Sequence, residues 1–168
     1  NKYYDALPAV VEKYMGKINE KLGTNYQLFN YYGAADADLV IVAMGSICDV
    51  AEEVIDYMNA HGEKVGLVKC RLYRPFCGDK LVAAIPATAK KIAVLDRTKE
   101  PGALGEPLYM DVVTALANAG VHATIIGGRY GLGPNDPPPP SVLAVPDQLK
   151  KDQPKHQFPI RIVATVPP

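Results

Sequence analysis

The chain has 168 residues, 48% of them hydrophobic, which is enough for one ordinary globular domain with a buried core. Its 18 basic and 18 acidic side chains give a formal net charge of zero, which argues against nucleic acid or an anionic membrane as a partner. No apolar stretch reaches the roughly 20 residues needed to cross a bilayer, and the first residues lack a signal-peptide pattern. We therefore expect a cytoplasmic chain, or a piece cut from inside a longer one.

The first predicted unit is an N-terminal helix with a connecting arm, residues 1–33. Apolar side chains recur every three or four positions over residues 7–22, Pro8 stands near the start and Gly23 follows the end. Residues 24–33 are rich in tyrosine and have no clear period. We expect them to form an arm that packs across another part of the protein.

The second predicted unit, residues 34–133, alternates short apolar runs with helical patterns. Apolar runs without polar alternation are typical of strands that are buried on both faces, as in parallel sheets. The predicted strands are 39–44, 65–68, 92–95 and 121–126, and the predicted helices begin after Ser46, at Asp79 and at Pro107. The fold class is therefore α/β, with an open, mainly parallel sheet and helices on both faces.

The third predicted unit, residues 134–168, is a proline-rich arm with a short helix and a tail that pack on the same domain. It contains ten prolines and no glycine. Residues 137–140 predict an extended polyproline segment, and Ser141 is a candidate cap for the helix. Pro146 removes a backbone hydrogen bond at a cost of about 3 kcal/mol, so we expect this helix to be short or broken.

Glycines and arginines follow the predicted strands, at the sheet edge where ligands tend to bind in open α/β folds. Helix N-termini at this edge can hold anions, and arginines can clamp a phosphate or a carboxylate. Acidic residues near the same edge favour ion pairs within the chain, or an interdomain contact, over a ligand clamp. The candidate anion-binding or interface residues are Gly45, Ser46, Arg71, Arg74, Arg97, Gly102, Gly105 and Arg129.

No catalytic residue and no metal site is predicted. The three histidines show no pairing with a nucleophile and an orienting carboxylate, and the three cysteines, Cys48, Cys70 and Cys77, have no metal-binding spacing. We expect free thiols. Cys48 lies at a predicted helix start, where a thiol pKa can be lowered, although a packed and inert cysteine is favoured.

Six segments, in order along the chain, resemble pyruvate:ferredoxin oxidoreductase. They are Asp38–Ser46, Gly62–Lys69, Arg71–Phe76, Lys91–Gly102, Gly105–Tyr109 and Gly127–Leu132. The resemblance extends over nearly the whole chain and points to one internal domain of that large enzyme, similar to the C-terminal domain of transketolase. Pro146 and the tail from Pro159 depart from the family pattern.

The resemblance implies that the intact enzyme oxidatively decarboxylates pyruvate with coenzyme A to acetyl-CoA and CO2, and reduces ferredoxin or flavodoxin. It implies thiamine diphosphate, Mg, 4Fe-4S clusters and CoA in domains that this chain lacks, and a homodimeric parent. For this chain it implies no cofactor and no catalytic residue. We therefore expect a noncatalytic scaffold that contacts other domains of the parent.

Two other hypotheses remain open. One is a module that itself binds a small anion, such as the CoA phosphate or a nucleotide, at the strand edge. The other is a thiol protein that uses Cys48.

Overall fold

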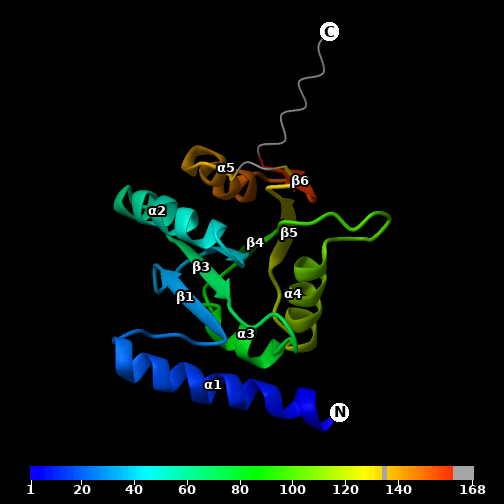
Figure 1. Ribbon diagram of the computed structural model, residues 1–168. Coiled ribbons are helices and arrows are strands. Elements are labelled where there is room, and N and C mark those ends of the chain that lie inside the picture. Colours follow the sequence, from blue (N-terminus) through cyan, green and yellow to red (C-terminus); the bar gives the residue numbers. More distant parts are fainter. Residues whose placement is uncertain (134–135, 161–168) are drawn as a thin grey trace.

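The computed structural model describes residues 1–133 and 136–160, which form five helices and six strands (Figure 1). The helices are α1 (Lys2–Leu22), α2 (Ile47–Ala60), α3 (Gly78–Ala84), α4 (Pro107–Asn118) and α5 (Pro139–Lys150). The strands are β1 (Phe29–Gly33), β2 (Leu39–Ala43), β3 (Val65–Cys70), β4 (Lys91–Asp96), β5 (Thr124–Arg129) and β6 (Phe158–Pro159).

All six strands belong to one open sheet in the order β1-β3-β2-β4-β5-β6. Strand β1 is antiparallel to β3, and every other neighbouring pair is parallel. The predicted α/β class with a mainly parallel sheet is confirmed. Because β2 to β5 run in the same direction, their carboxyl ends lie at one edge.

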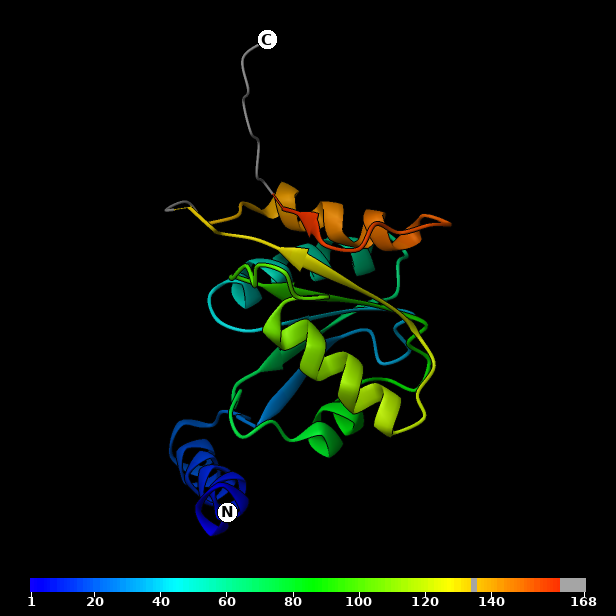
Figure 2. The same ribbon diagram turned by 90° about the vertical axis from the view of Figure 1, so that its right-hand side faces the viewer.

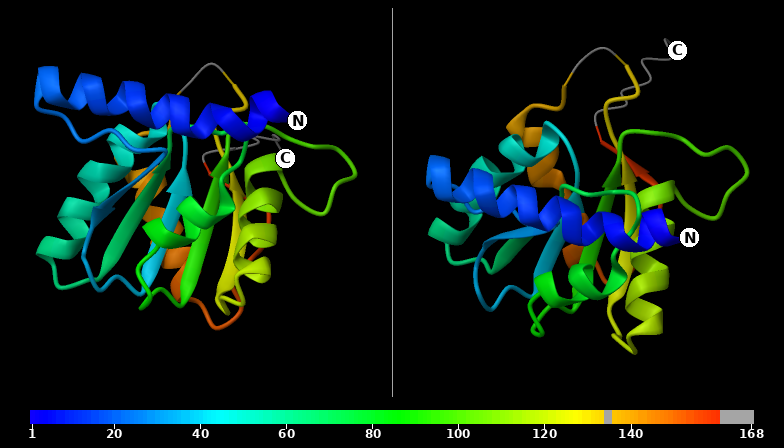
Figure 3. Two further views of the ribbon diagram at one scale, coloured as in Figure 1. Left: turned by 90° about the horizontal axis from the view of Figure 1, so that it is seen from below. Right: turned by 60° about the horizontal axis from the view of Figure 1, so that its bottom comes forward.

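Helices cover both faces of the sheet (Figure 2). Side chains of β2 alternate between two buried clusters, since successive strand residues point to opposite faces. Ile41 belongs to the cluster with α2 and α5, and Val42 belongs to the cluster with α3 and α4. Helix α1 lies beyond α3, outside both helical layers (Figure 3), and has no buried residue.

Helix α1 begins at Lys2, five residues before the predicted start. Asn1 caps it, because its side-chain oxygen accepts a hydrogen bond from the Tyr3 N–H at 3.4 Å. Pro8 therefore lies inside the helix and does not mark its start.

The predicted arm, residues 24–33, ends in the edge strand β1, which the sequence analysis missed. Tyr31 of β1 pairs with Val68 of β3, and its ring lies over Gly66. A Cβ atom at Gly66 would lie 2.1 Å from the Tyr31 hydroxyl oxygen, so a glycine is needed there. A cross-strand fit of this kind leaves no periodic signal in the tyrosine-rich segment.

Strand β5 is shifted three residues beyond the predicted run at 121–126. Val121 instead lies in the turn after α4, where its N–H donates to the Leu116 carbonyl at 3.0 Å. Gly127 and Gly128, which follow the predicted run, pair with β4 inside the sheet. A Cβ atom at Gly128 would lie 2.7 Å from the Phe158 ring, so this glycine makes room for a side chain of the neighbouring strand β6.

The final helix α5 is continuous over 12 residues, so the predicted break at Pro146 is wrong. Three core side chains of α5, Val142, Val145 and Leu149, are fully buried, and this packing outweighs the lost backbone bond. The helix starts at Pro139, so Ser141 lies inside it, and residues 139–140 are helical where an extended arm was expected.

The segment after α5 adds strand β6, which pairs in parallel with β5. Phe158 and Ile160 are buried in the cluster with α2 and α5. The tail that departs from the family pattern continues through residues 161–168, which lie outside the described residues, as do residues 134 and 135.

Candidate functional site

The candidate residues gather at the carboxyl edge of the parallel strands. Gly45 and Ser46 follow β2, Arg71 follows β3, Arg97 follows β4 and Arg129 ends β5. The sheet order places these strand ends side by side. The structure therefore brings the predicted residues to one edge, and the partners of each side chain decide what that edge can do.

Asp96, at the end of β4, is buried and holds the start of α4. Its two carboxylate oxygens accept hydrogen bonds from the Leu108 N–H at 3.0 Å and the Tyr109 N–H at 3.1 Å. Burial raises the pKa of Asp96, and these two hydrogen bonds oppose the rise. The carboxylate is thus used by the fold as a helix cap.

Arg129 forms an ion pair with Glu106, whose side chain is 2% exposed. The second oxygen of Glu106 accepts a hydrogen bond from the Glu100 N–H at 2.5 Å. One buried carboxylate therefore joins the end of β5 to the loop before α4. The guanidinium of Arg129 neutralises that carboxylate. Because the two groups bind each other, neither is available to a ligand.

Arg74 and Arg97 also pair with carboxylates of the chain. The guanidinium carbon of Arg74 lies 3.9 Å from the centre of the Tyr73 ring. Its Nη1 forms an ion pair with the Oδ2 of Asp111 in α4 at 2.7 Å. Arg97 contacts Asp136 at 3.1 Å and donates to the Gly131 carbonyl at the same distance. The sequence analysis expected ion pairs near this edge but did not identify Asp111 or Asp136, which are distant along the chain.

Arg71 differs from the other three arginines. Its Nε donates to the Asn30 side-chain oxygen at 2.8 Å, and its guanidinium lies 4.7 Å from the centre of the Tyr26 ring. Within residues 1–133 and 136–160 it has no carboxylate at ion-pair distance. Arg71 is exposed, so it is the candidate arginine whose charge remains most open to a partner.

The candidate glycines have two different structural roles. Gly45 and Gly102 both have a φ angle of +80°, a conformation that side chains rarely adopt. Gly105 is buried, and a Cβ atom there would lie 2.2 Å from the Tyr109 ring. Ser46 is exposed at the start of α2, and its side chain makes no capping hydrogen bond with the described residues.

His156 lies near this edge, which the sequence did not predict. Its Nδ1 accepts a hydrogen bond from the Gly127 N–H at 3.1 Å, so its Nε2 carries the proton and donates to the Leu104 carbonyl at 3.0 Å. Its ring also packs against the ring of Tyr109, and the two ring centres are 4.5 Å apart. His156 therefore ties the loop before α4 to β5, and no sequence pattern links these distant residues.

The cysteines are free thiols, as predicted. Burial raises the pKa of Cys48 to about 11 and that of Cys70 to about 12, the opposite of what a reactive thiol needs. This contradicts the thiol hypothesis for Cys48. The part of the chain that the structure describes has no cluster of three potential metal ligands, and none of its helices could span a membrane.

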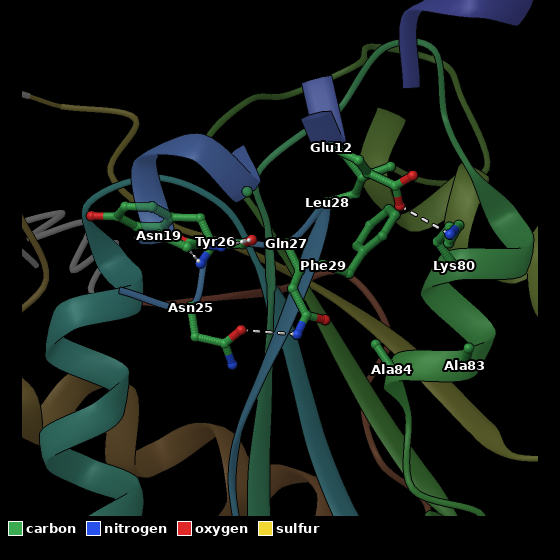
Figure 4. Close-up of a pocket in the computed structure, with 11 residues that line it drawn as sticks. Glu12, Asn19, Asn25, Tyr26, Gln27, Leu28, Phe29, Lys80, Ala83 and Ala84 are labelled. Atoms are coloured by element: carbon green, nitrogen blue, oxygen red, sulfur yellow. Dashed lines mark hydrogen bonds and ion pairs between the residues drawn. The ribbon is translucent and has the colours of Figure 1, made fainter. Parts of the chain in front are cut away.

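A cavity of about 360 Å³ lies between α1, residues 25–29 and α3 (Figure 4). Its polar groups bond to one another. Glu12 pairs with Lys80 at 2.9 Å, and the Asn19 side chain bonds to both the N–H and the carbonyl of Tyr26. The polar contacts that line the cavity therefore hold α1 against the rest of the chain.

Residues 37–141 match the family model of pyruvate:ferredoxin oxidoreductase core domain II. The chain belongs to this family. The matched range covers the sheet from β2 to β5 together with α2, α3 and α4, whereas α1 and β1 precede it. The recognition from sequence segments is thereby confirmed.

Curated relatives extend over nearly the whole chain. A pyruvate:ferredoxin oxidoreductase of Moorella thermoacetica is 50% identical over 166 residues, which are 99% of this chain and 14% of that protein. A pyruvate-flavodoxin oxidoreductase of Enterobacter agglomerans is 49% identical over 162 residues, which are 96% of this chain and 14% of that protein. The chain thus spans about a seventh of the length of these relatives.

A solved structure shares the fold. It is a 2-oxoglutarate:ferredoxin oxidoreductase of Magnetococcus marinus with 2-oxoglutarate, coenzyme A and succinyl-CoA bound. The TM-score is 0.50 at 20% identity, and the match covers 73% of this chain and 20% of that chain. At this identity the match supports the fold alone.

Proposed function

We propose that this chain is a noncatalytic segment of a pyruvate:ferredoxin or flavodoxin oxidoreductase, and that it supports and contacts other domains of the enzyme. The observation that carries the proposal is the edge of the sheet, where Asp96, Glu106, Arg74, Arg97 and Arg129 all bond to other groups of this chain. Groups held in this way stabilise a scaffold and are not free to act on a substrate.

The proposed parent enzyme oxidatively decarboxylates pyruvate with CoA to acetyl-CoA and CO2, and passes electrons to ferredoxin or flavodoxin. The names and lengths of the relatives support this assignment. We place the parent in the cytoplasm as a homodimer. The proposed units stay 1–33, 34–133 and 134–168, with β1 joining the first unit to the sheet of the second.

The described residues do not fit an iron–sulfur cluster or a bound magnesium ion. Iron–sulfur clusters are held by thiolates, whereas burial keeps Cys48 and Cys70 protonated. The described residues also lack a group of carboxylates and histidines suited to a magnesium ion. We therefore assign Mg and the 4Fe-4S clusters to other domains, and on the scaffold proposal thiamine diphosphate and CoA are held there as well.

A direct test is an assay of the purified 168-residue chain with pyruvate, CoA, thiamine diphosphate and a viologen dye. We expect no turnover from a chain that circular dichroism shows to be folded. Measurable turnover would overturn the proposal.

The second candidate function is binding of a small anion such as the CoA phosphate. It is favoured by one observation: Arg71 is exposed and has no carboxylate partner among the described residues. In the full-length enzyme, Arg71→Ala should leave the KM for CoA unchanged if this chain is a scaffold. A rise of about tenfold, with unchanged KM for pyruvate, would favour the anion site.

A further inference from the structure

Helix α1 has an exposed apolar stripe along one side. The stripe consists of Tyr3, Val10, Tyr14, Ile18 and Leu22, whose exposed fractions are 75%, 46%, 57%, 42% and 71%. From Val10 onward the members are spaced four residues apart, so they follow one side of the helix. A contiguous exposed apolar patch often marks an interaction site, whereas single scattered apolar residues on a surface do not.

The side of α1 that adjoins the stripe fixes the helix in place. Val11 and Met15 are half-buried against the cluster of α3 and α4, Glu12 pairs with Lys80, and Asn19 bonds to Tyr26. These contacts hold α1 against the chain and leave the side chains of the stripe exposed. In Figure 3 the helix lies along the outside of the molecule, and no other described helix or strand lies on its outer side.

A row of lysines accompanies the stripe. Lys13, Lys17 and Lys21 are also spaced four residues apart, and Lys17 lies 5.1 Å from the centre of the Tyr14 ring. None of the three has a carboxylate at ion-pair distance within residues 1–133 and 136–160. A surface that is complementary to α1 would therefore have an apolar groove with carboxylates along one border.

The relatives indicate where this complementary surface lies. The match to the Moorella thermoacetica protein spans 166 residues and so includes α1, yet it covers only 14% of that polypeptide. The core-domain match begins at residue 37, after α1. Helix α1 is thus an addition to the core domain inside a much longer chain, most of which is available to cover it.

We infer that another domain of the same oxidoreductase polypeptide covers the α1 stripe, through an apolar groove bordered by carboxylates. The inference rests on the proposed function and names the surface by which the scaffold makes its interdomain contact. A basic amphipathic helix can also lie on an anionic membrane. The zero net charge of the chain and the position of α1 within a longer polypeptide favour the domain.

The first test measures thiol labelling in the full-length oxidoreductase. Tyr14→Cys and Ile18→Cys place a thiol in the stripe, and Ala9→Cys and Glu20→Cys place one on an exposed side of α1 away from it. Mass spectrometry measures the rate at which maleimide labels each introduced cysteine in the native enzyme. This rate is divided by the labelling rate of the same cysteine in denaturant. We expect the two stripe positions to react at least about tenfold more slowly than the controls. Equal rates would overturn the inference.

The second test identifies what covers the stripe. A photo-crosslinking benzoylphenylalanine replaces Tyr14 in the full-length enzyme. A product at the mass of one polypeptide, with the crosslink to a distant segment of the same sequence, is the expected result. A product at twice that mass would show a second copy, and binding to phosphatidylserine vesicles that Ile18→Glu abolishes would show a membrane. Either outcome would overturn the inference.

The two proposals fail independently. Fast labelling of the stripe would exclude the docking surface and leave the noncatalytic role intact. Turnover by the isolated chain would exclude the noncatalytic role whatever the labelling shows.

Discussion

At the scale of single residues, the charged groups of the carboxyl edge satisfy one another. The pair of Arg129 and Glu106 is the most buried of these contacts, with side-chain exposed fractions of 19% and 2%. Burying charge is costly unless each charge has a partner, so removing one member leaves the other uncompensated. The structure thus concentrates much of the stability of the edge in a few side chains.

Arg129→Ala should lower the free energy of unfolding of the chain by about 3 kcal/mol, because Glu106 would be left as an unpaired buried carboxylate. Urea denaturation followed by circular dichroism measures the change. The matched control is Lys64→Ala, which removes the exposed ion pair with Asp36 and should leave the midpoint nearly unchanged. Equal effects of the two substitutions would contradict this account of Arg129.

Asp96 should give the chain a characteristic dependence on pH. Burial raises its pKa in the folded state, so the folded protein binds a proton more readily than the unfolded chain. The contribution of Asp96 to stability is therefore greatest below its unfolded pKa and decreases as the pH rises through the raised, folded pKa.

Asp96→Asn removes this titration. In urea titrations, the free energy of unfolding of the wild type minus that of the variant should decrease as the pH rises from the ordinary pKa of an aspartate, about 3.9, through the raised pKa of the folded state. A difference that increases over this interval would show that the two hydrogen bonds from α4 outweigh burial.

At the scale of elements, glycines inside strands decide how neighbouring elements approach. Gly66 of β3 receives the Tyr31 ring of β1, and Gly128 of β5 receives the Phe158 ring of β6. The two edge strands thus both depend on a missing side chain in the strand beside them. Either edge strand should therefore be sensitive to one added methyl group.

Gly66→Ala should lower the free energy of unfolding by about 1–3 kcal/mol, because the new methyl group displaces the Tyr31 ring. Hydrogen exchange should show the loss of protection concentrated in β1. Gly16→Ala in α1 is the control, since a Cβ atom there meets nothing within 4 Å and alanine favours a helix. Unchanged protection of β1 in Gly66→Ala would be inconsistent with this role of the glycine.

At the scale of the whole molecule, the two outer helices contribute differently. Both buried clusters are built from residue 28 onward, and α1 adds only half-buried side chains. Helix α5 places Val142, Val145 and Leu149 in the core. The core therefore requires α5 but not α1, which agrees with an outward role for α1.

Deletion of residues 1–23 should leave a chain that unfolds cooperatively, with a melting temperature lowered by less than about 5 °C. Truncation after residue 133, which removes α5, should abolish the cooperative transition because it opens the core. Differential scanning calorimetry distinguishes the two. Loss of the transition in the first deletion would show that α1 is part of the folding unit.

The sequence by itself determined the fold class, the family and the edge where the charged residues meet. Apolar runs report strands that are buried on both faces, and parallel strands must share a carboxyl edge, so local patterns were sufficient. The same patterns could not predict β1 or the position of β5, because both depend on an aromatic ring of one strand fitting over a glycine of its neighbour.

Only the tertiary structure decided what the edge and the outer helices do. The partners of Arg74 and Arg97 are Asp111 and Asp136, each more than 35 positions away, and no spacing rule connects them. The continuity of α5 through Pro146 likewise depends on burial against α2. Periodicity predicted an apolar face over residues 7–22, but only packing showed that Tyr14, Ile18 and Leu22 stay exposed whereas Val11 is half-buried. Local sequence determines which elements form, whereas contacts between distant residues determine which side chains remain available to a partner.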